Sequence, residues 1–237
     1  MAYKNKIILI VITARGGSKR LPGKNIKLLN GKPMIAYAIE AVKYSKYADR
    51  LIVSTDNPEI ASISRQYGAE TPFMRPNELS DDTASSLTVL QHAVKWMEDK
   101  GNFKPDIVVL IQPTSPLVLA EDVNGTIEKM VDNDTNSCFS VCEITQRPEW
   151  MFIVDGDMAR PYIKNVPEIA RSQDFPPLFI TNGAVYAMKT DILMKRNMIR
   201  DRQNSSVYLM PSHRSIDIDT PTDFKLAELM MKEMQNK

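Results

Sequence analysis

Three short, almost continuously apolar runs rich in β-branched residues constrain the fold of this chain more than any other feature. They lie at residues 6–13, 50–55 and 106–112. Such runs are typical of parallel strands that are covered on both faces. Stretches with the apolar spacing of amphipathic helices separate them, at residues 32–45, 58–68 and 85–98. Strands that alternate with helices in this way predict an α/β fold with a doubly wound, mostly parallel, Rossmann-like sheet.

The pattern changes after residue 137. From there to residue 190 the sequence contains strand-like runs and turns such as DGD, without convincing helical spacing. We therefore expect a single domain over residues 1–237 that carries an inserted, antiparallel, strand-rich lobe at 137–190. A short helix, a last strand and a closing helix with Thr220 as candidate N-cap are expected at residues 190–197, 207–211 and 220–235.

Composition excludes several classes of protein. Hydrophobic residues make up 43% and charged residues 25% of the chain, which is ordinary for a globular protein. A net charge of +1 argues against a general nucleic-acid or membrane-surface binder. No apolar run approaches the ~18 residues of a membrane span. The two cysteines, Cys138 and Cys142, would lie roughly 13 Å apart in a strand, too far for a disulfide. We expect a cytoplasmic protein.

The loop after the first predicted strand, ARGGSKRLPGKN (14–25), combines four basic residues with three glycines. Glycines let successive backbone N–H groups converge on an oxyanion, and lysine and arginine neutralise a polyphosphate. A Walker A loop does not fit, because five residues separate Gly17 from Gly23 and Asn25 stands where a hydroxyl is required. A solvated, charged turn is the alternative. We expect the loop to bind phosphates.

Two aspartates near the end of the chain, Asp217 and Asp219, alternate in SIDIDT and so share one face of an extended segment. Carboxylates about 7 Å apart repel each other unless a cation lies beside them. Magnesium prefers one or two carboxylates together with phosphate oxygens, so the pair is a candidate Mg²⁺ site for a metal–triphosphate complex. A solvated strand end is the alternative.

The block RPNELSDDTASS (75–86) combines Arg75 with the hydroxyls of Ser85 and Ser86 just before a predicted helix. These groups could donate hydrogen bonds to the carbonyl of a nucleobase. A helix-capping segment is an equally good interpretation, because the aspartates and the threonine in the block are competent caps.

Taken together, these motifs resemble the acylneuraminate cytidylyltransferases, the CMP-sugar synthetases that activate sialic-acid-like sugars. The resemblance covers nearly the whole chain, in the order of the blocks at 14–25, 53–61, 75–86, 110–117, 182–186 and 215–224. It implies transfer of CMP from CTP to the anomeric hydroxyl of a nine-carbon 2-keto sugar acid, of the sialic or legionaminic type. Pyrophosphate would be released and Mg²⁺ required.

The resemblance also implies roles for individual residues. It assigns the CTP phosphates to Arg15, Ser18, Lys19 and Lys24, the ribose to Asn25, and the cytosine to Arg75, Ala84 and Ser86. It assigns the sugar acid to Gln112, Trp150, Arg171 and Tyr186. It assigns catalysis to Arg15, Lys24, Asp217 and Asp219, and Mg²⁺ binding to the two aspartates. The 137–190 lobe would reach over the active site of the neighbour in a homodimer.

The sugar half departs from the bacterial sialic-acid enzymes of this family. Trp150 and Ile180 stand where those enzymes place a lysine and an arginine. Loss of two charges and gain of apolar area favour a sugar with a deoxygenated, methyl-bearing tail, such as legionaminic acid.

Three other readings remain open from the sequence. A Kdo cytidylyltransferase shares RLPG and NGKPMI, although this chain reads QPTSP where that family has a glutamine-glycine-aspartate stretch. A D-x-D glycosyltransferase shares the aspartate pair, but not the glycine-rich loop. A catalytically inactive relative that senses CTP is disfavoured by the intact Lys24, Arg75 and aspartates.

Overall fold

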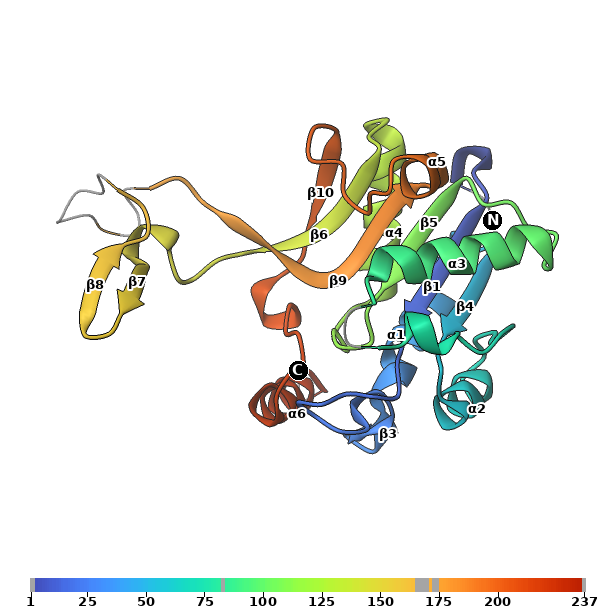
Figure 1. Cartoon of the computed structure of the whole chain (residues 1–237), viewed down its shortest axis with the longest axis horizontal. Helices are drawn as coiled ribbons and strands as arrows, with labels where there is room; N and C mark the ends of the chain where they lie inside the picture. Colours follow the sequence, from blue (N-terminus) through green and yellow to red (C-terminus); the bar gives the residue numbers. More distant parts are fainter. Residues whose placement is uncertain (1–2, 82–83, 165–170, 172–174, 236–237) are drawn as a thin grey trace.

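The computed structural model describes residues 3–81, 84–164, 171 and 175–235 (Figure 1). Its centre is a six-stranded sheet in the order β10–β6–β9–β5–β1–β4. Neighbouring strands in it run parallel, except where β9 pairs with β5 and β6. The strands are β1 (Ile8–Thr13), β4 (Arg50–Ser54), β5 (Ile107–Ile111), β6 (Ser137–Glu143), β9 (Phe179–Lys189) and β10 (Ser205–Leu209). The predicted mostly parallel sheet is confirmed.

Helices cover both faces of this sheet (Figure 1). One face packs against α1 (Met34–Lys43), α2 (Pro58–Gln66) and α4 (Ala120–Asp132), and the other against α3 (Ser86–Asp99) and α5 (Thr190–Lys195). Successive β1 side chains point to opposite faces, so Ile10 belongs to the first core and Val11 to the second. Because both faces of β1 are buried, the strand is apolar at every position from 8 to 12, as the sequence predicts.

The closing helix α6 (Pro221–Gln235) packs Phe224 and Ala227 into a third apolar cluster, which also contains Leu117 and Ile218. Thr220 Oγ1 accepts a hydrogen bond from the Asp223 backbone N–H at 3.3 Å, and Asp223 Oδ2 accepts from the Thr220 N–H at 2.8 Å. This reciprocal pair is a capping box, so the predicted N-cap is confirmed.

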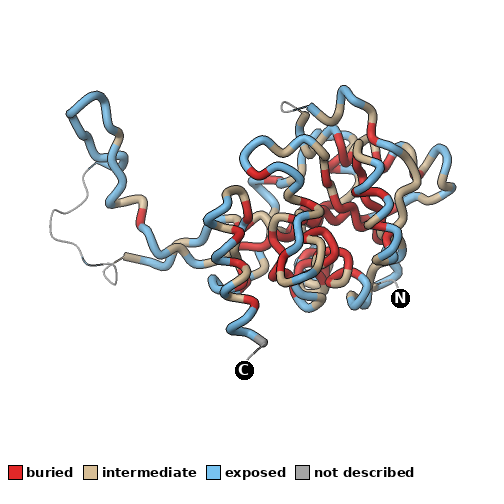
Figure 2. Tube along the Cα trace, turned by 90° about the horizontal axis from the view of Figure 1, so that it is seen from below, coloured by how far each residue is buried: buried red, intermediate tan, exposed pale blue. Residues whose placement is uncertain are grey.

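The described residues between 142 and 180 form an arm that projects from the body (Figure 1). Its tip is the hairpin of β7 (Phe152–Asp155) and β8 (Met158–Pro161). The expected lobe boundaries of 137–190 are too wide, because the start of β6 and most of β9 belong to the central sheet. Their apolar residues are buried there rather than in a separate lobe. Figure 2 shows the contrast between the buried body and the exposed arm.

The remaining elements are short. Strands β2 (Leu28–Leu29) and β3 (Lys32–Pro33) form a small two-stranded sheet. The described 3₁₀ turns are η1 (Tyr3–Asn5), η2 (Lys24–Ile26), η3 (Asn77–Leu79), η4 (Pro148–Trp150) and η6 (Ser212–Arg214). Both cysteines are free thiols on β6, as predicted. In the described part of the chain, no helix combines the length and the hydropathy needed to cross a bilayer.

Candidate active site

A pocket of about 260 Å³ lies at the carboxyl ends of β1 and β5, where parallel sheets bind ligands. It collects predicted CTP contacts from two separate segments of the chain, the blocks at 14–25 and 75–86. These are Arg15, Lys24, Asn25, Arg75, Ala84 and Ser86. The predicted sugar contact Gln112 lines the same pocket.

A second hollow of about 310 Å³ shares the side chains of Arg15, Lys24 and Asn25 with the first. Its other lining residues are Ser18, Lys19, Arg20 and Asp219. All eight residues assigned to CTP therefore lie in two hollows that adjoin through shared walls. Most of the charge on these walls is positive, which suits a polyphosphate.

A left-handed glycine and two hydrogen bonds between side chains and the backbone hold the glycine-rich loop in shape. Gly23 has φ +65°, a conformation that side chains with a Cβ rarely adopt, and it leads into η2. Asn25 is buried, and its Nδ2 donates to the Arg15 carbonyl oxygen at 2.9 Å, closing the loop across ten residues. The Gly16 N–H donates to Asp56 Oδ1 at 2.9 Å, which ties the loop to the end of β4.

Lys24 and Asp219 both line the second hollow and contact each other there. Lys24 Nζ donates to Asp219 Oδ1 and to the Ile218 carbonyl oxygen, each at 3.0 Å. Arg20 Nη1 lies 3.1 Å from Asp219 Oδ2. The Lys24 side chain is only 15% exposed, whereas that of Arg20 is 71% exposed. Asp219 therefore joins the glycine-rich loop to the segment that carries the aspartate pair.

Asp217 lies where Gln112 and Gly183 approach each other. A Cβ added to Gly183 would lie 3.6 Å from both Asp217 Oδ2 and Gln112 Oε1, and its φ of +81° further restricts the position to glycine. Asp217 keeps an exposed surface, but the protein around its carboxyl raises the pKa by desolvation. A hydrogen bond from Thr114 lowers that pKa, and the charge of Asp219 raises it.

The donor set fits Mg²⁺ only in part. Within the described ranges, no group of three or more His, Cys, Asp or Glu side chains could hold a metal ion. Asp217 and Asp219 offer two carboxylates beside a basic hollow. Mg²⁺ binds well through one or two carboxylates when phosphate oxygens and water complete its shell, so the pair fits a metal that arrives with a triphosphate.

Arg75 forms the far wall of the first pocket and is 6% exposed. Its Nε donates to Ser54 Oγ at 3.0 Å, and its Nη2 donates to the Ser54 carbonyl oxygen. Burial lowers the pKa of Arg75 to about 10, while the charge of Asp56 raises it and that of Arg15 lowers it. The guanidinium stays charged at neutral pH and is fixed by the end of β4.

The segment before α3 combines capping with pocket lining. Ser85 is the N-cap of α3, and its Oγ accepts from the Thr88 N–H at 3.2 Å. Asp81 Oδ1 accepts from the Ala84 N–H at 2.7 Å. The segment does cap α3, but the cap is Ser85, which the sequence suggests as a donor to a nucleobase carbonyl, whereas Ala84 and Ser86 line the pocket. The other two candidate caps, residues 82 and 83, lie outside the described residues.

The four predicted sugar contacts lie in different parts of the chain. Gln112 lies in the pocket, and Tyr186 lies on β9 with its ring centroid 6.4 Å from that of Phe139. Burial raises the pKa of Tyr186. Trp150, 46% exposed, and Arg171, also exposed, lie on the arm and line neither hollow. One chain alone does not bring the four together.

Two residues that contribute to the site are not assigned a role by the sequence. Thr114 Oγ1 donates to Gln112 Oε1 at 3.5 Å, and the Thr114 carbonyl oxygen accepts from the Ile218 N–H at 2.8 Å. Arg20 pairs with Asp219. Both lie inside the motifs at 110–117 and 14–25, but only the fold shows that these motifs meet residues 217–219.

A basic, glycine-rich loop that faces a carboxylate pair at the carboxyl ends of parallel strands defines an α/β protein built to handle nucleotide phosphates. A family model described as Cytidylyltransferase matches residues 9–228, and the chain belongs to that family of enzymes. The CMP-sugar synthetase resemblance of the sequence is thereby confirmed.

Individual relatives agree with this assignment. The chain is 36% identical to the CMP-N,N'-diacetyllegionaminic acid synthase of Legionella pneumophila, over 95% of this chain and 96% of that protein. It is 32% identical to the pseudaminic acid cytidylyltransferase of Campylobacter jejuni, over 94% and 96% of the two chains. The solved structure of CMP-2-keto-3-deoxy-manno-octonic acid synthetase with CTP has a TM-score of 0.71 at 20% identity, over 96% of this chain and 99% of that one. This last likeness concerns the fold alone.

Proposed function

We propose that the chain transfers CMP from CTP to the anomeric hydroxyl of a nine-carbon 2-keto sugar acid and releases pyrophosphate. The observation that carries the proposal is the convergence of all eight CTP-assigned residues on two adjoining hollows beside Asp217 and Asp219. The activities named for the two sequence relatives support the choice of sugar acid.

The geometry suits a nucleoside triphosphate laid across both hollows. Arg75, Ala84 and Ser86 would contact the cytosine in the first hollow, and Asn25 the ribose at the shared wall. Arg15, Ser18, Lys19 and Lys24 would contact the phosphates. Lys24 belongs to the loop and contacts Asp219, so its ammonium group can stabilise the negative charge that develops on the leaving pyrophosphate.

In the reaction the anomeric hydroxyl loses its proton to water as its oxygen forms a bond to the α-phosphorus, and the bond from that phosphorus to the oxygen that bridges to the β-phosphate breaks, so that pyrophosphate leaves with that oxygen. Positioning and charge neutralisation dominate such transfers, so no covalent protein nucleophile is required. We infer that Asp217 and Asp219 hold Mg²⁺, which when bound supplies Lewis-acid stabilisation of phosphate charge. The chain's own part is to orient the triphosphate and to hold the two carboxylates beside it.

We infer a homodimer in which the arm of one chain covers the active site of the other. Large apolar side chains are exposed along the arm, unlike the surface of most monomers. They include Met151, Phe152, Val154, Met158 and Tyr162. This arrangement would also bring Trp150 and Arg171 of one chain to the pocket of its neighbour.

We propose a sugar acid of the legionaminic type as the preferred acceptor. Trp150 and Ile180, 46% and 56% exposed on the arm, offer apolar surface and no charge to the sugar tail. Methyl-sized discrimination in such a pocket is worth about 10- to 200-fold. The free thiols Cys138 and Cys142 support a cytoplasmic location, where thiols stay reduced.

Pyrophosphate release tests the function directly. The purified protein is mixed with Mg²⁺, CTP and one sugar acid, either N,N′-diacetyllegionaminic acid, N-acetylneuraminic acid or Kdo, and UTP replaces CTP as a control. We expect release only with CTP, and the highest kcat/KM with the legionaminic acid. A preference for N-acetylneuraminic acid would overturn the sugar proposal alone. Release with Kdo only, or with no sugar acid, would overturn the function.

A further inference from the structure

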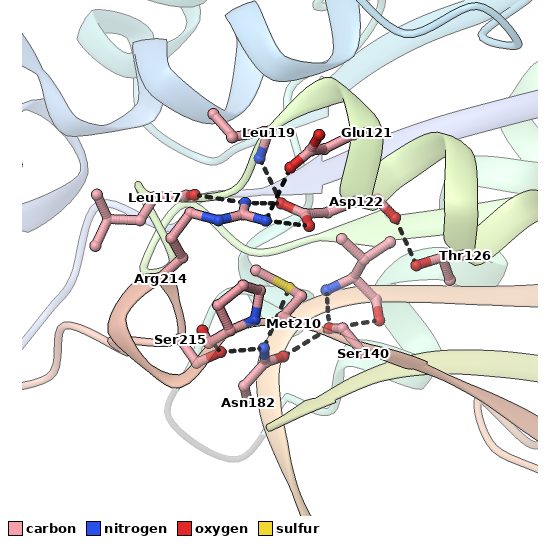
Figure 3. Close-up of polar contacts among 12 residues, drawn as sticks. Leu117, Leu119, Glu121, Asp122, Thr126, Ser140, Asn182, Met210, Arg214 and Ser215 are labelled. Carbon is pink, nitrogen blue, oxygen red and sulfur yellow. Dashed lines mark hydrogen bonds and ion pairs between the residues drawn. The ribbon is translucent and has the colours of Figure 1, made fainter. Parts of the chain in front are cut away.

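A buried ion pair joins Arg214, which precedes the aspartate pair in the chain, to Asp122, and neither residue lines either hollow (Figure 3). Arg214, in η6, is 6% exposed, and Asp122, in the first turn of α4, is fully buried. The two Nη atoms of Arg214 donate to the two oxygens of the Asp122 carboxylate, with Nη2 to Oδ1 at 3.0 Å. Nη2 also donates to Glu121 Oε1 at 3.0 Å. This forked contact fixes both the distance and the plane of the guanidinium.

Stability alone is a weak reason for such a pair. Two buried charges lose their hydration, and apolar residues of similar volume often stabilise a protein as well or better. Asp122 has a second bond that fixes its carboxylate, because Oδ2 accepts from the Leu119 N–H at 2.8 Å. Arg214 is therefore docked on a rigid helix start, three residues before Asp217.

A second anchor holds the next residue (Figure 3). Asn182 Nδ2 donates to Ser215 Oγ at 2.9 Å, and Asn182 Oδ1 accepts from Ser140 Oγ at 2.6 Å. Asn182 lies on β9 and Ser140 on β6, so Ser215 is tied to the central sheet. Asn182 also precedes Gly183, the glycine that faces Asp217.

The segment that carries the aspartates needs these anchors. Between the end of β10 at Leu209 and the start of α6 at Pro221, the chain forms only the three-residue turn η6. The Ile218 N–H donates to Thr114, but no strand ladder runs through residues 215–219. Asp219 is also held by Lys24 and by the Asp223 carboxylate, so the side-chain anchors at 214 and 215 act mainly on the stretch that leads into Asp217.

We propose that Arg214, held by Asp122, is a positioning residue for Asp217 and Asp219. It touches neither hollow and acts by fixing the backbone from which the carboxylates project. The proposal rests on the proposed function, in which these carboxylates hold a divalent cation with CTP. Partners of this kind behind metal ligands typically change metal affinity or activity by about 10- to 100-fold when removed.

Two variants separate positioning from folding. Arg214→Lys keeps the charge opposite Asp122 but loses the fork. The double variant R214M/D122L removes both charges and leaves neither unpaired in the interior. The matched control is R50M/E70L, which removes the forked pair of Arg50 and Glu70 at the start of β4, away from both hollows.

The first readout is Mn²⁺ binding, measured by electron paramagnetic resonance on full-length protein with a CTP analogue whose α,β-bridge is methylene. The second is the split between kcat and the KM for CTP. We expect Mn²⁺ affinity and kcat to fall about 10- to 100-fold in both test variants, with KM for CTP changed less than about threefold. The control should match the parent in both readouts.

Unchanged Mn²⁺ affinity in either test variant, or an equal loss in R50M/E70L, overturns the positioning role. Melting temperatures identify a variant that has lost its fold. If the double variant is unfolded, the result for R214K decides the test. Failure of the parent to release pyrophosphate would count against the proposed function. The Mn²⁺ measurement does not depend on turnover, so the two failures remain distinguishable.

Discussion

Lys24 and Arg20 offer a controlled comparison, because both cations contact the same carboxylate. Lys24 Nζ lies 3.0 Å from Asp219 Oδ1, and Arg20 Nη1 lies 3.1 Å from Asp219 Oδ2. Lys24 is 15% exposed and lines both hollows, whereas Arg20 is 71% exposed and lines only the second hollow. If proximity to Asp219 alone mattered, the two substitutions would have equal effects.

The expected magnitudes differ. A hydrogen bond to a charged group in a half-enclosed site is worth about 1.5–3 kcal/mol, so Lys24→Ala should lower kcat/KM for CTP about 10- to 150-fold. An exposed ion pair is worth about 0–1 kcal/mol, so Arg20→Ala should lower it at most about fivefold. Steady-state pyrophosphate release at saturating sugar acid measures both. Equal effects, or an unchanged kcat/KM in Lys24→Ala, would remove Lys24 from the phosphate site.

Three further predictions concern metal, packing and assembly. Asp217→Asn should raise the Mg²⁺ concentration for half-maximal rate with an unchanged circular dichroism spectrum, and an unchanged titration midpoint would show that this carboxylate is not a ligand. Gly125→Ala places a Cβ 2.2 Å from Tyr208 Cε2, so overpacking should outweigh the gain in helix propensity by about 1–2 kcal/mol. Calorimetry should then show a Tm lower by roughly 2–8 °C, and an equal or higher Tm would contradict the close α4–β10 contact. Light scattering at micromolar concentration should return twice the chain mass of 26.8 kDa, whereas the single-chain mass would refute the homodimer.

Local pattern predicts the part of the fold where both faces of a strand are buried. The run at residues 6–13 becomes β1 because its side chains serve two cores at once, which leaves no polar position to confuse the pattern. The sequence does not predict α4, although Val123, Ile127 and Met130 have helical spacing. Gly125 weakens that pattern. The ring of Tyr208 packs against this position so closely that it leaves no room for a Cβ. A contact between elements more than eighty residues apart leaves no local signal.

In the site, too, the sequence predicts the local motifs but not the contacts between distant segments. The loop at 14–25 and the aspartate pair are recognisable from residue type and spacing, because their chemistry is local. Their meeting through Lys24 and Asp219 depends on Ile218 being buried against Leu117, which only the tertiary structure reveals. The sequence predicts the boundary of the arm least well. Apolar strand residues at 137–141 and 181–189 have the same pattern whether the strand belongs to the central sheet or to a separate lobe.

The salt bridges of Asp219 bear on the order in which ligands enter. A carboxylate already neutralised by Lys24 and Arg20 offers little attraction to a free divalent cation. A triphosphate competes for the same two cations, and in drawing them away it would restore the negative charge of Asp219. We therefore expect CTP to bring its own metal, with free Mg²⁺ binding weakly to the empty site and inhibiting little. Order-of-addition kinetics should show a compulsory sequence, and removing Lys24 should relax it.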